Sequence, residues 1–186
     1  MTAADFPSLF AVLGDAAAYR QGFRMHPCPA TPAECETLLR ERYFDRPGRL
    51  AFTVRMIGAG SEQAIVGTTA LLDIDVANQS IHLGATMYAP RWWGGVVNPE
   101  TKLLLMGYVF DECGFGRLRL QTDALNTRSA AAIARLGAVR EGVLRRDLRR
   151  GDGTFRDTVV FSVLREEWPI VQQGLRARIA AINGMP

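Results

Sequence analysis

The sequence predicts one mixed α/β domain with a strand, a glycine-containing loop and a helix at its centre. Helix-like and strand-like segments follow in the order helix, helix, three strands, helix, strand, helix, two strands and helix, which is typical of a mixed fold. The chain has 186 residues, a length typical of one domain. Of these residues 48% are hydrophobic, which is enough for a substantial core. It contains no internal repeat and no low-complexity segment. We therefore treat 1–186 as a single domain.

Caps, turns and periodicity predict where each element lies. Thr31 is expected to cap a helix, with Pro32 at the first helical position and Glu34 as the capping-box acid. Alternation predicts strands, and the turn over 151–153 predicts a hairpin between the last two. The expected helices cover a segment from Asp5 or Ser8 to about Tyr19, then 31–43, 98–113, 126–136 and a C-terminal segment from Glu166. The expected strands cover 50–57, 64–74, 80–88, 117–122, 139–149 and 154–164.

The most informative segment joins the third strand to the central helix, with the sequence Trp93-Gly94-Gly95-Val96-Val97-Asn98. Unpaired N–H groups and the dipole at a helix start attract anions. Asn98 as the N-cap, with Pro99 after it, places Lys102 in the first turn, where a cation opposes the dipole. A bound anion such as a phosphate explains this placement. The helix interior, 103–110, is apolar nearly all round and is expected to be buried.

The third strand, 80–88, has two different faces. One face is apolar and suits the core, and consists of Ile81, Leu83, Ala85 and Met87. The opposite face is small, polar and titratable, as in the lining of a cleft, and consists of His82, Gly84, Thr86 and Tyr88. A lone histidine in a strand is often only structural, but His82 shares its face with these small residues, and an imidazole titrates near neutrality.

Charge and cysteine content exclude several classes. A net charge of +3 favours anionic ligands and falls far short of a nucleic-acid signature. The thiols Cys28, Cys35 and Cys113 form no CxxC pair and are expected to be reduced in a cytoplasmic protein. With only His26 and His82, no metal site is expected. No signal peptide and no membrane span is expected.

The stretch 140–156 is rich in arginine. On a hairpin this predicts a solvated face with cross-strand pairing to Glu141, Asp147 and Asp157. Binding of nucleic acid or an acidic protein is the alternative interpretation, testable by its salt dependence.

Four segments, in this order and spacing, resemble the GNAT acetyltransferase superfamily. LGATMYAPRWWGG resembles its fourth strand and pyrophosphate loop, and VNPETKLLL resembles a helix start of its RimJ/RimL-type branch. NTRSAAAIARLGAVREGVLR resembles the branch's Asn-x-x-Ser helix and next strand, and DGTFRDTVVFSVLREEW resembles its last hairpin arm. That branch acetylates protein N-termini and other amines.

The resemblance implies a mostly antiparallel twisted sheet, splayed at the coenzyme A site and flanked by helices. It also implies acetyl-CoA as donor and an amine as acceptor, with no metal. The residues implied at the cofactor are Met87, Tyr88, Trp93, Gly94, Gly95, Val96, Val97, Asn98, Lys102, Asn126 and Arg128. Backbone N–H groups of 94–98 hold the pyrophosphate in this scheme, and Met87 and Tyr88 bond the pantetheine. His82 is the candidate base, Ser129 the candidate donor to the departing thiol, and Met25 and Trp92 the candidate acceptor residues.

The chain departs from the superfamily pattern at several positions. Val96 stands where the loop usually has glycine, Ile133 where a helix often has the tyrosine acid, and His82 where the branch has glutamate. Relatives begin with a strand before the first helix, so that strand is missing or the true start lies upstream. A catalytically weak coenzyme A-binding module is therefore a second hypothesis. A homodimer is a possible assembly.

Overall fold

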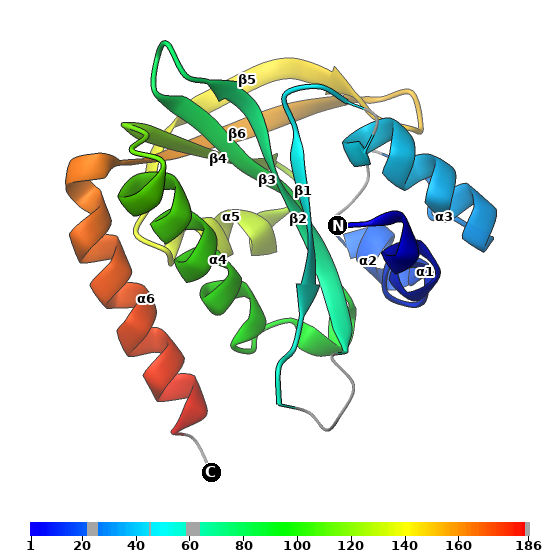
Figure 1. Cartoon of the computed structure of the whole chain (residues 1–186). Coiled ribbons are helices and arrows are strands. Elements are labelled where there is room, and N and C mark those ends of the chain that lie inside the picture. Colours follow the sequence, from blue (N-terminus) through cyan, green and yellow to red (C-terminus); the bar gives the residue numbers. More distant parts are fainter. Residues whose placement is uncertain (22–25, 45, 59–63, 185–186) are drawn as a thin grey trace. The chain divides into compact units, whose positions relative to one another are not determined.

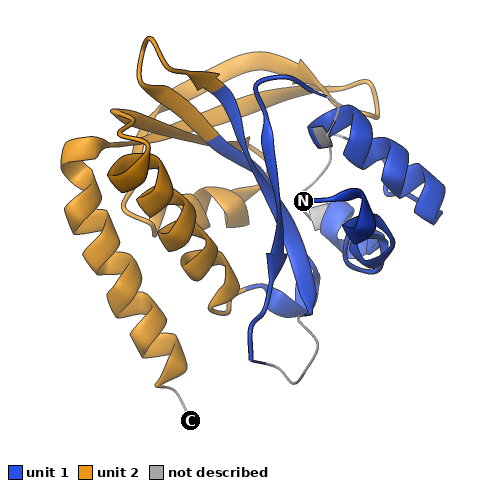
Figure 2. Cartoon of the chain, in the orientation of Figure 1, with its two compact units in different colours: residues 1–73, 83–93 blue, residues 74–82, 94–186 orange. Residues whose placement is uncertain are grey.

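The computed structural model describes residues 1–21, 26–44, 46–58 and 64–184 (Figure 1). The chain forms two compact units, coloured separately in Figure 2. Unit 1 comprises Met1–Asp73 and Leu83–Trp93, and unit 2 comprises Ile74–His82 and Gly94–Pro186. The expectation of one domain stays a prediction.

Unit 1 holds the N-terminal helices and the first hairpin. Its elements are a 3-10 turn Ala3–Asp5, α1 Phe6–Leu13, α2 Ala16–Gln21, α3 Pro32–Leu39, a π-helical turn Arg40–Phe44, β1 Leu50–Arg55 and most of β2 Ile65–Asp75. The strands β1 and β2 pair antiparallel, so the expected hairpin is confirmed. The core is formed by apolar residues of α1, α3, β2 and β3, among them Leu9, Cys35, Leu39, Ala70 and Met87.

Two details of the first helices differ from expectation. The single helix expected to end near Tyr19 is two helices, because Asp15 Oδ1 accepts a hydrogen bond from the N–H of Ala17 at 2.7 Å and begins a new helix. The next helix start is confirmed: Thr31 Oγ1 accepts from the N–H of Glu34 at 3.2 Å. The Glu34 carboxylate accepts from the N–H of Ala30, one residue before the expected partner.

Unit 2 contains the remaining helices and the long C-terminal hairpin. Its elements are the start of β3 Ser80–Tyr88, α4 Val97–Gly107, a π-helical turn Tyr108–Glu112, β4 Arg117–Asp123, α5 Thr127–Ala134, β5 Val139–Arg149, β6 Phe155–Leu164, a 3-10 turn Arg165–Glu167 and α6 Trp168–Asn183. The indole N–H of Trp168 donates to the Asp111 carboxylate at 3.0 Å, which joins the start of α6 to the end of the α4 segment.

The six strands follow the order β1-β2-β3-β4-β6-β5. The β4–β6 and β5–β6 pairs are antiparallel, and the β3–β4 pair is parallel, joining Ser80–His82 to Arg117–Arg119. A mostly antiparallel sheet flanked by helices is therefore confirmed as the fold class (Figure 1). One face of β4 and β6 is apolar and buried, with Leu118 opposite Val163 and Leu120 opposite Phe161.

The central helix differs from expectation in two respects. It begins at Val97, with Val96 as its N-cap, so Asn98 is the second helical residue and does not cap it. The segment 103–110 is not buried all round, because Leu104 of α4 is 73% exposed and Tyr108 of the following π-helical turn is 45% exposed. Within the described residues, no helix combines the length and apolarity that crossing a bilayer requires.

Candidate functional site

The start of α4 presents an open backbone. Gly94 has φ +79°, a left-handed conformation that favours glycine, and a Cβ placed on it meets no atom within 4 Å. The N-cap Val96 has helical angles, and no side chain caps the helix. The first N–H groups of α4 therefore lack the side-chain acceptor that Asn98 was expected to supply. Such a segment fits a phosphate group, as the sequence predicts.

Lys102 is not in the first turn of α4. Because the helix begins at Val97, this lysine is the sixth helical residue, on the face that also buries Pro99 and Met106. Only 5% of Lys102 is exposed, and burial lowers the pKa of its amine from 10.5 to about 7. The expected cation at the helix start is thus a buried amine within the helix, whose charged form burial disfavours. Its proposed role at the phosphates stays a prediction.

The start of α5 has the expected geometry. Asn126 Oδ1 accepts a hydrogen bond from the N–H of Ser129 at 3.0 Å, so Asn126 is the N-cap. Arg128 lies on the exposed side of this first turn, whereas Ser129 is half-buried. Ile133, at the position where a tyrosine acid was considered, is buried. The amide of Asn126 and the hydroxyl of Ser129 stay candidates for the pantetheine and the thiol.

His82 lies in the part of β3 that belongs to unit 2. Its Cα is in register with that of Arg119 on β4, so the two side chains share one face of the sheet, and His82 is only 5% exposed. The two-faced pattern does not continue regularly along β3, because Ala85 has φ +51° and interrupts the alternation. Sequence periodicity could not predict this, because alanine seldom adopts that conformation.

The end of β3 in unit 1 is closely packed. Met87 is buried in the core, as expected, but Tyr88 is buried as well, so the face expected to line a cleft is closed there. A Cβ on Gly67 would lie 2.2 Å from the Met87 carbonyl oxygen and 2.5 Å from Tyr88 Cδ1, so this close approach requires glycine. The carbonyl of Tyr88 accepts from the indole N–H of Trp93 at 3.0 Å.

Trp92, Trp93 and Met25 are the remaining candidate residues for the acceptor and the cofactor. Trp92 and Trp93 both pack, partly buried, against the core of unit 1. Their places at the acceptor and the cofactor stay predictions. Met25 lies outside the described residues. Burial, and secondarily the charge of Arg42, lowers the pKa of the neighbouring His26 to about 4, so this imidazole is neutral at physiological pH.

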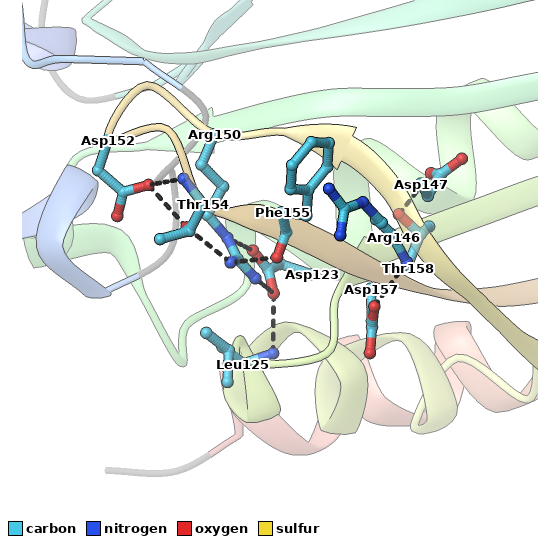
Figure 3. A network of polar contacts seen from close by, with 10 residues as sticks. All are labelled: Asp123, Leu125, Arg146, Asp147, Arg150, Asp152, Thr154, Phe155, Asp157 and Thr158. Carbon is cyan, nitrogen blue, oxygen red and sulfur yellow. Dashed lines mark hydrogen bonds and ion pairs between the residues drawn. The ribbon is translucent and has the colours of Figure 1, made fainter.

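Sequence reasoning missed a network of polar contacts in unit 2 (Figure 3). Arg150 is buried and donates through Nε and Nη2 to the two carboxylate oxygens of Asp123, at 2.8 and 2.9 Å. Its Nη1 donates to Thr154 Oγ1 at 3.1 Å and to the Phe155 carbonyl at 2.5 Å. Asp123 and Arg150 are 27 positions apart, and no local pattern links them.

The expected cross-strand ion pairs of the arginine-rich hairpin are mostly replaced by other contacts. Glu141 pairs with Arg117 of β4, which donates from Nη1 and Nη2 at 2.5 and 2.6 Å. Asp147 accepts from the Thr158 hydroxyl, and Asp157 accepts from the backbone N–H of Arg146. The carboxylates of the hairpin therefore accept hydrogen bonds from a backbone N–H, a hydroxyl and an arginine of β4. Bulges on β5 displace its side chains from regular cross-strand pairing.

Metal-ligating side chains and thiols are the remaining groups to place. Across the described ranges, no group of three His, Cys, Asp or Glu residues is placed to hold a metal ion. Cys28, Cys35 and Cys113 are free, and Cys113 is exposed at the end of the α4 segment.

The family model of the acetyltransferase (GNAT) domain matches residues 1–139 of the chain. A crystal structure from T. thermophilus, assigned to the acetyltransferases without a named substrate, is 34% identical with a TM-score of 0.83, covering 96% of this chain and 90% of that one. A GCN5-related N-acetyltransferase from Brucella melitensis is 31% identical with a TM-score of 0.82, covering 94% of this chain and 77% of that one.

A more distant similarity concerns the fold alone. The spermidine N-acetyltransferase from Vibrio cholerae, solved with CoA and spermine, is 15% identical with a TM-score of 0.71, covering 91% of this chain and 95% of that one. A comparison with curated proteins gives no match.

Proposed function

We propose, because the chain belongs to the acetyltransferase (GNAT) family, that it transfers the acetyl group of acetyl-CoA to a primary amine. The family transfers acetyl groups from acetyl-CoA to amines. The branch, the compartment and the class of acceptor are part of the proposal. We place the chain in the RimJ/RimL-type branch, acting in the cytoplasm on a protein N-terminus or a small amine. The observation that carries the proposal is the open, uncapped start of α4 after Gly94.

The proposed cofactor site uses backbone groups more than charged side chains. The N–H groups of 94–98 are proposed to hold the pyrophosphate, because the left-handed Gly94 and the uncapped helix leave donors available. Met87 and Tyr88 are proposed to bond the pantetheine through their backbone groups, and the Tyr88 carbonyl also accepts a hydrogen bond from the indole N–H of Trp93. Asn126, Arg128 and Trp93 complete the set.

Two side chains are proposed to handle protons. His82 accepts a proton from the acceptor ammonium, directly or through water, so that the free amine attacks the thioester carbonyl in a ternary complex. A backbone N–H near Met87 or Tyr88 stabilises the oxyanion. As the carbon–sulfur bond breaks, Ser129 donates a hydrogen bond to the departing thiolate. No cysteine is proposed as a covalent intermediate.

A binding module with weak catalysis is the second candidate. It is favoured by Val96, which restricts the backbone where the superfamily prefers glycine, and by the burial of His82. The nucleic-acid alternative has less support, since Arg150 of the hairpin is buried in an ion pair with Asp123 of β4.

One experiment separates the two candidates. Release of free thiol from acetyl-CoA is measured with a panel of amines, beside a thermal shift with CoA. Turnover on at least one amine together with a thermal shift is expected. A thermal shift without turnover on any amine favours the binding module, and the absence of both rejects the proposed site.

A further inference from the structure

The strand β5 is an edge of the sheet, and one of its two sides is unpaired. The strand order ends in β6-β5, so β5 pairs with β6 alone. In an edge strand, about half of the backbone N–H and C=O groups point away from the sheet and can pair with another strand. Every residue of β5 except Gly142 is exposed. The free side of β5 is therefore open to solvent along its length.

The two faces of this edge differ in chemistry. Along β6, even-numbered residues point to one face of the sheet and odd-numbered residues to the other. The apolar residues Val139, Leu144 and Leu148 lie opposite even-numbered residues, so they share the first face. They are 52%, 49% and 39% exposed, respectively. Arg140 and Arg149 lie opposite odd-numbered residues and share the second face. The edge thus presents apolar side chains on one face and guanidinium groups on the other.

The hairpin has more positive charge than its own carboxylates balance. Each carboxylate between 139 and 164 accepts a hydrogen bond from another group of the hairpin (Figure 3). These carboxylates are Glu141, Asp147, Asp152 and Asp157. By contrast, Arg140, Arg145 and Arg149 form no ion pair within the described ranges. An exposed edge with unbalanced guanidinium groups favours an acidic partner.

We propose that β5 binds an extended acidic segment of another protein, which adds to the sheet as a further strand. The segment that fits has acidic and apolar residues in alternation. Its acids then lie on the face of Arg140 and Arg149, and its apolar residues lie on the face of Val139 and Leu144; cross-strand pairs of both kinds are favourable. The partners of the two arginines on β6 are Phe161 and Phe155, an even number of positions apart, so one alternating segment reaches both.

Two other occupants match this edge less well. A second copy of the chain places the same arginine-rich strand against itself, and like charges on facing strands are unfavourable. Nucleic acid satisfies guanidinium groups through its phosphates, but it offers nothing to the unpaired backbone or to the exposed Val139 and Leu144. Charges and bulges protect edge strands from unwanted pairing, and here the charges select against basic strands while favouring acidic ones.

The test uses a nonapeptide in which glutamate and valine alternate, with its N-terminus acetylated so that it is no acceptor amine. In calorimetric titration at low salt, we expect it to bind at least about tenfold more tightly than the same peptide with lysine for glutamate, or with a central proline. The double variant Arg140→Gln and Arg149→Gln is expected to bind it about three- to tenfold more weakly. Arg135→Gln with Arg176→Gln is the matched control, because it removes two exposed arginines outside the hairpin, and it binds as the wild type does.

Hydrogen exchange shows whether the peptide adds as a strand. Saturating peptide is expected to slow exchange of the β5 backbone N–H groups that face away from β6 by about tenfold or more, since they gain carbonyl partners. No binding, binding without this protection, or undiminished binding by the double variant at Arg140 and Arg149 overturns the inference. A concentration-dependent dimer with β5 protected in the absence of peptide also overturns it, because a second copy then covers the edge. Duplex DNA that binds more tightly and displaces the peptide has the same consequence.

Discussion

Arg150 and Asp123 form a buried two-point ion pair that joins the turn of the β5–β6 hairpin to the end of β4. The side chains are 7% and 6% exposed, and the N···O distances are 2.8 and 2.9 Å. Asp123 also accepts from the N–H of Leu125, one residue before the N-cap Asn126. The pair therefore fixes the backbone that leads into α5 (Figure 3). This helix carries Ser129.

Arg150→Met is expected to lower the free energy of unfolding by about 3–5 kcal/mol, because it leaves the Asp123 carboxylate buried without its cation. Urea unfolding measures the change. Arg117→Met is the matched control: its pair with Glu141 is about one-third exposed, at 34% for each side chain, and its loss costs only about 0–1 kcal/mol. Equal losses in the two variants would contradict the prediction.

The Glu141 carboxylate predicts a loss of stability in acid. Hydrogen bonding from Arg117 is the main cause that holds the pKa of Glu141 at about 2, below its ordinary 4.5. The unfolded chain binds this proton first, so the stabilisation is present above pH 4.5 and is lost as the pH falls towards 2. Glu141→Gln is expected to flatten the fall in urea midpoint across this window. Solvent screening keeps the effect small, and an unchanged slope argues against it.

The buried amine of Lys102 predicts a second rise of stability with pH, in the neutral to alkaline range. Because burial lowers the pKa of this amine from 10.5 to about 7, the unfolded chain binds more protons between these values, and stability rises with pH across that range. Lys102→Met is expected to remove the rise and to stabilise the protein at pH 7. Urea unfolding at both ends of the window measures it. A rise that persists in the variant means that another group causes it.

The sequence predicted the elements that local signals define, and missed those that depend on distant or strained contacts. The cap at Asn126 and the hairpin turn around Gly153 were found because the side chain or φ preference lies in the segment itself. The α4 start was misplaced because Asn98 and Pro99 are good capping residues that tertiary packing overrode. Hydrophobic periodicity does not indicate the Arg150–Asp123 pair or the left-handed conformation of Ala85.

His82→Ala is expected to lower kcat by about 100-fold or more while changing the KM for acetyl-CoA little, as loss of a general base predicts. Thiol release at saturating acceptor measures kcat. His82→Gln serves as the variant of similar polarity, and it should lose the acidic limb of the pH–rate profile with kcat equally low. Wild-type turnover in both variants would show that His82 is structural.

Gly94→Ala is expected to raise the KM for acetyl-CoA about three- to tenfold with little change in kcat. Space does not limit the substitution, since an added Cβ meets no atom within 4 Å, but φ +79° costs an alanine about 1–2 kcal/mol. The loop relieves that cost by rotating, which turns the proposed phosphate-binding N–H groups away. Gly142→Ala is the matched control, because that position is equally open and its φ is not positive. If both variants keep the wild-type KM, the left-handed conformation at Gly94 does not serve the cofactor, and the open start of α4 loses its proposed role.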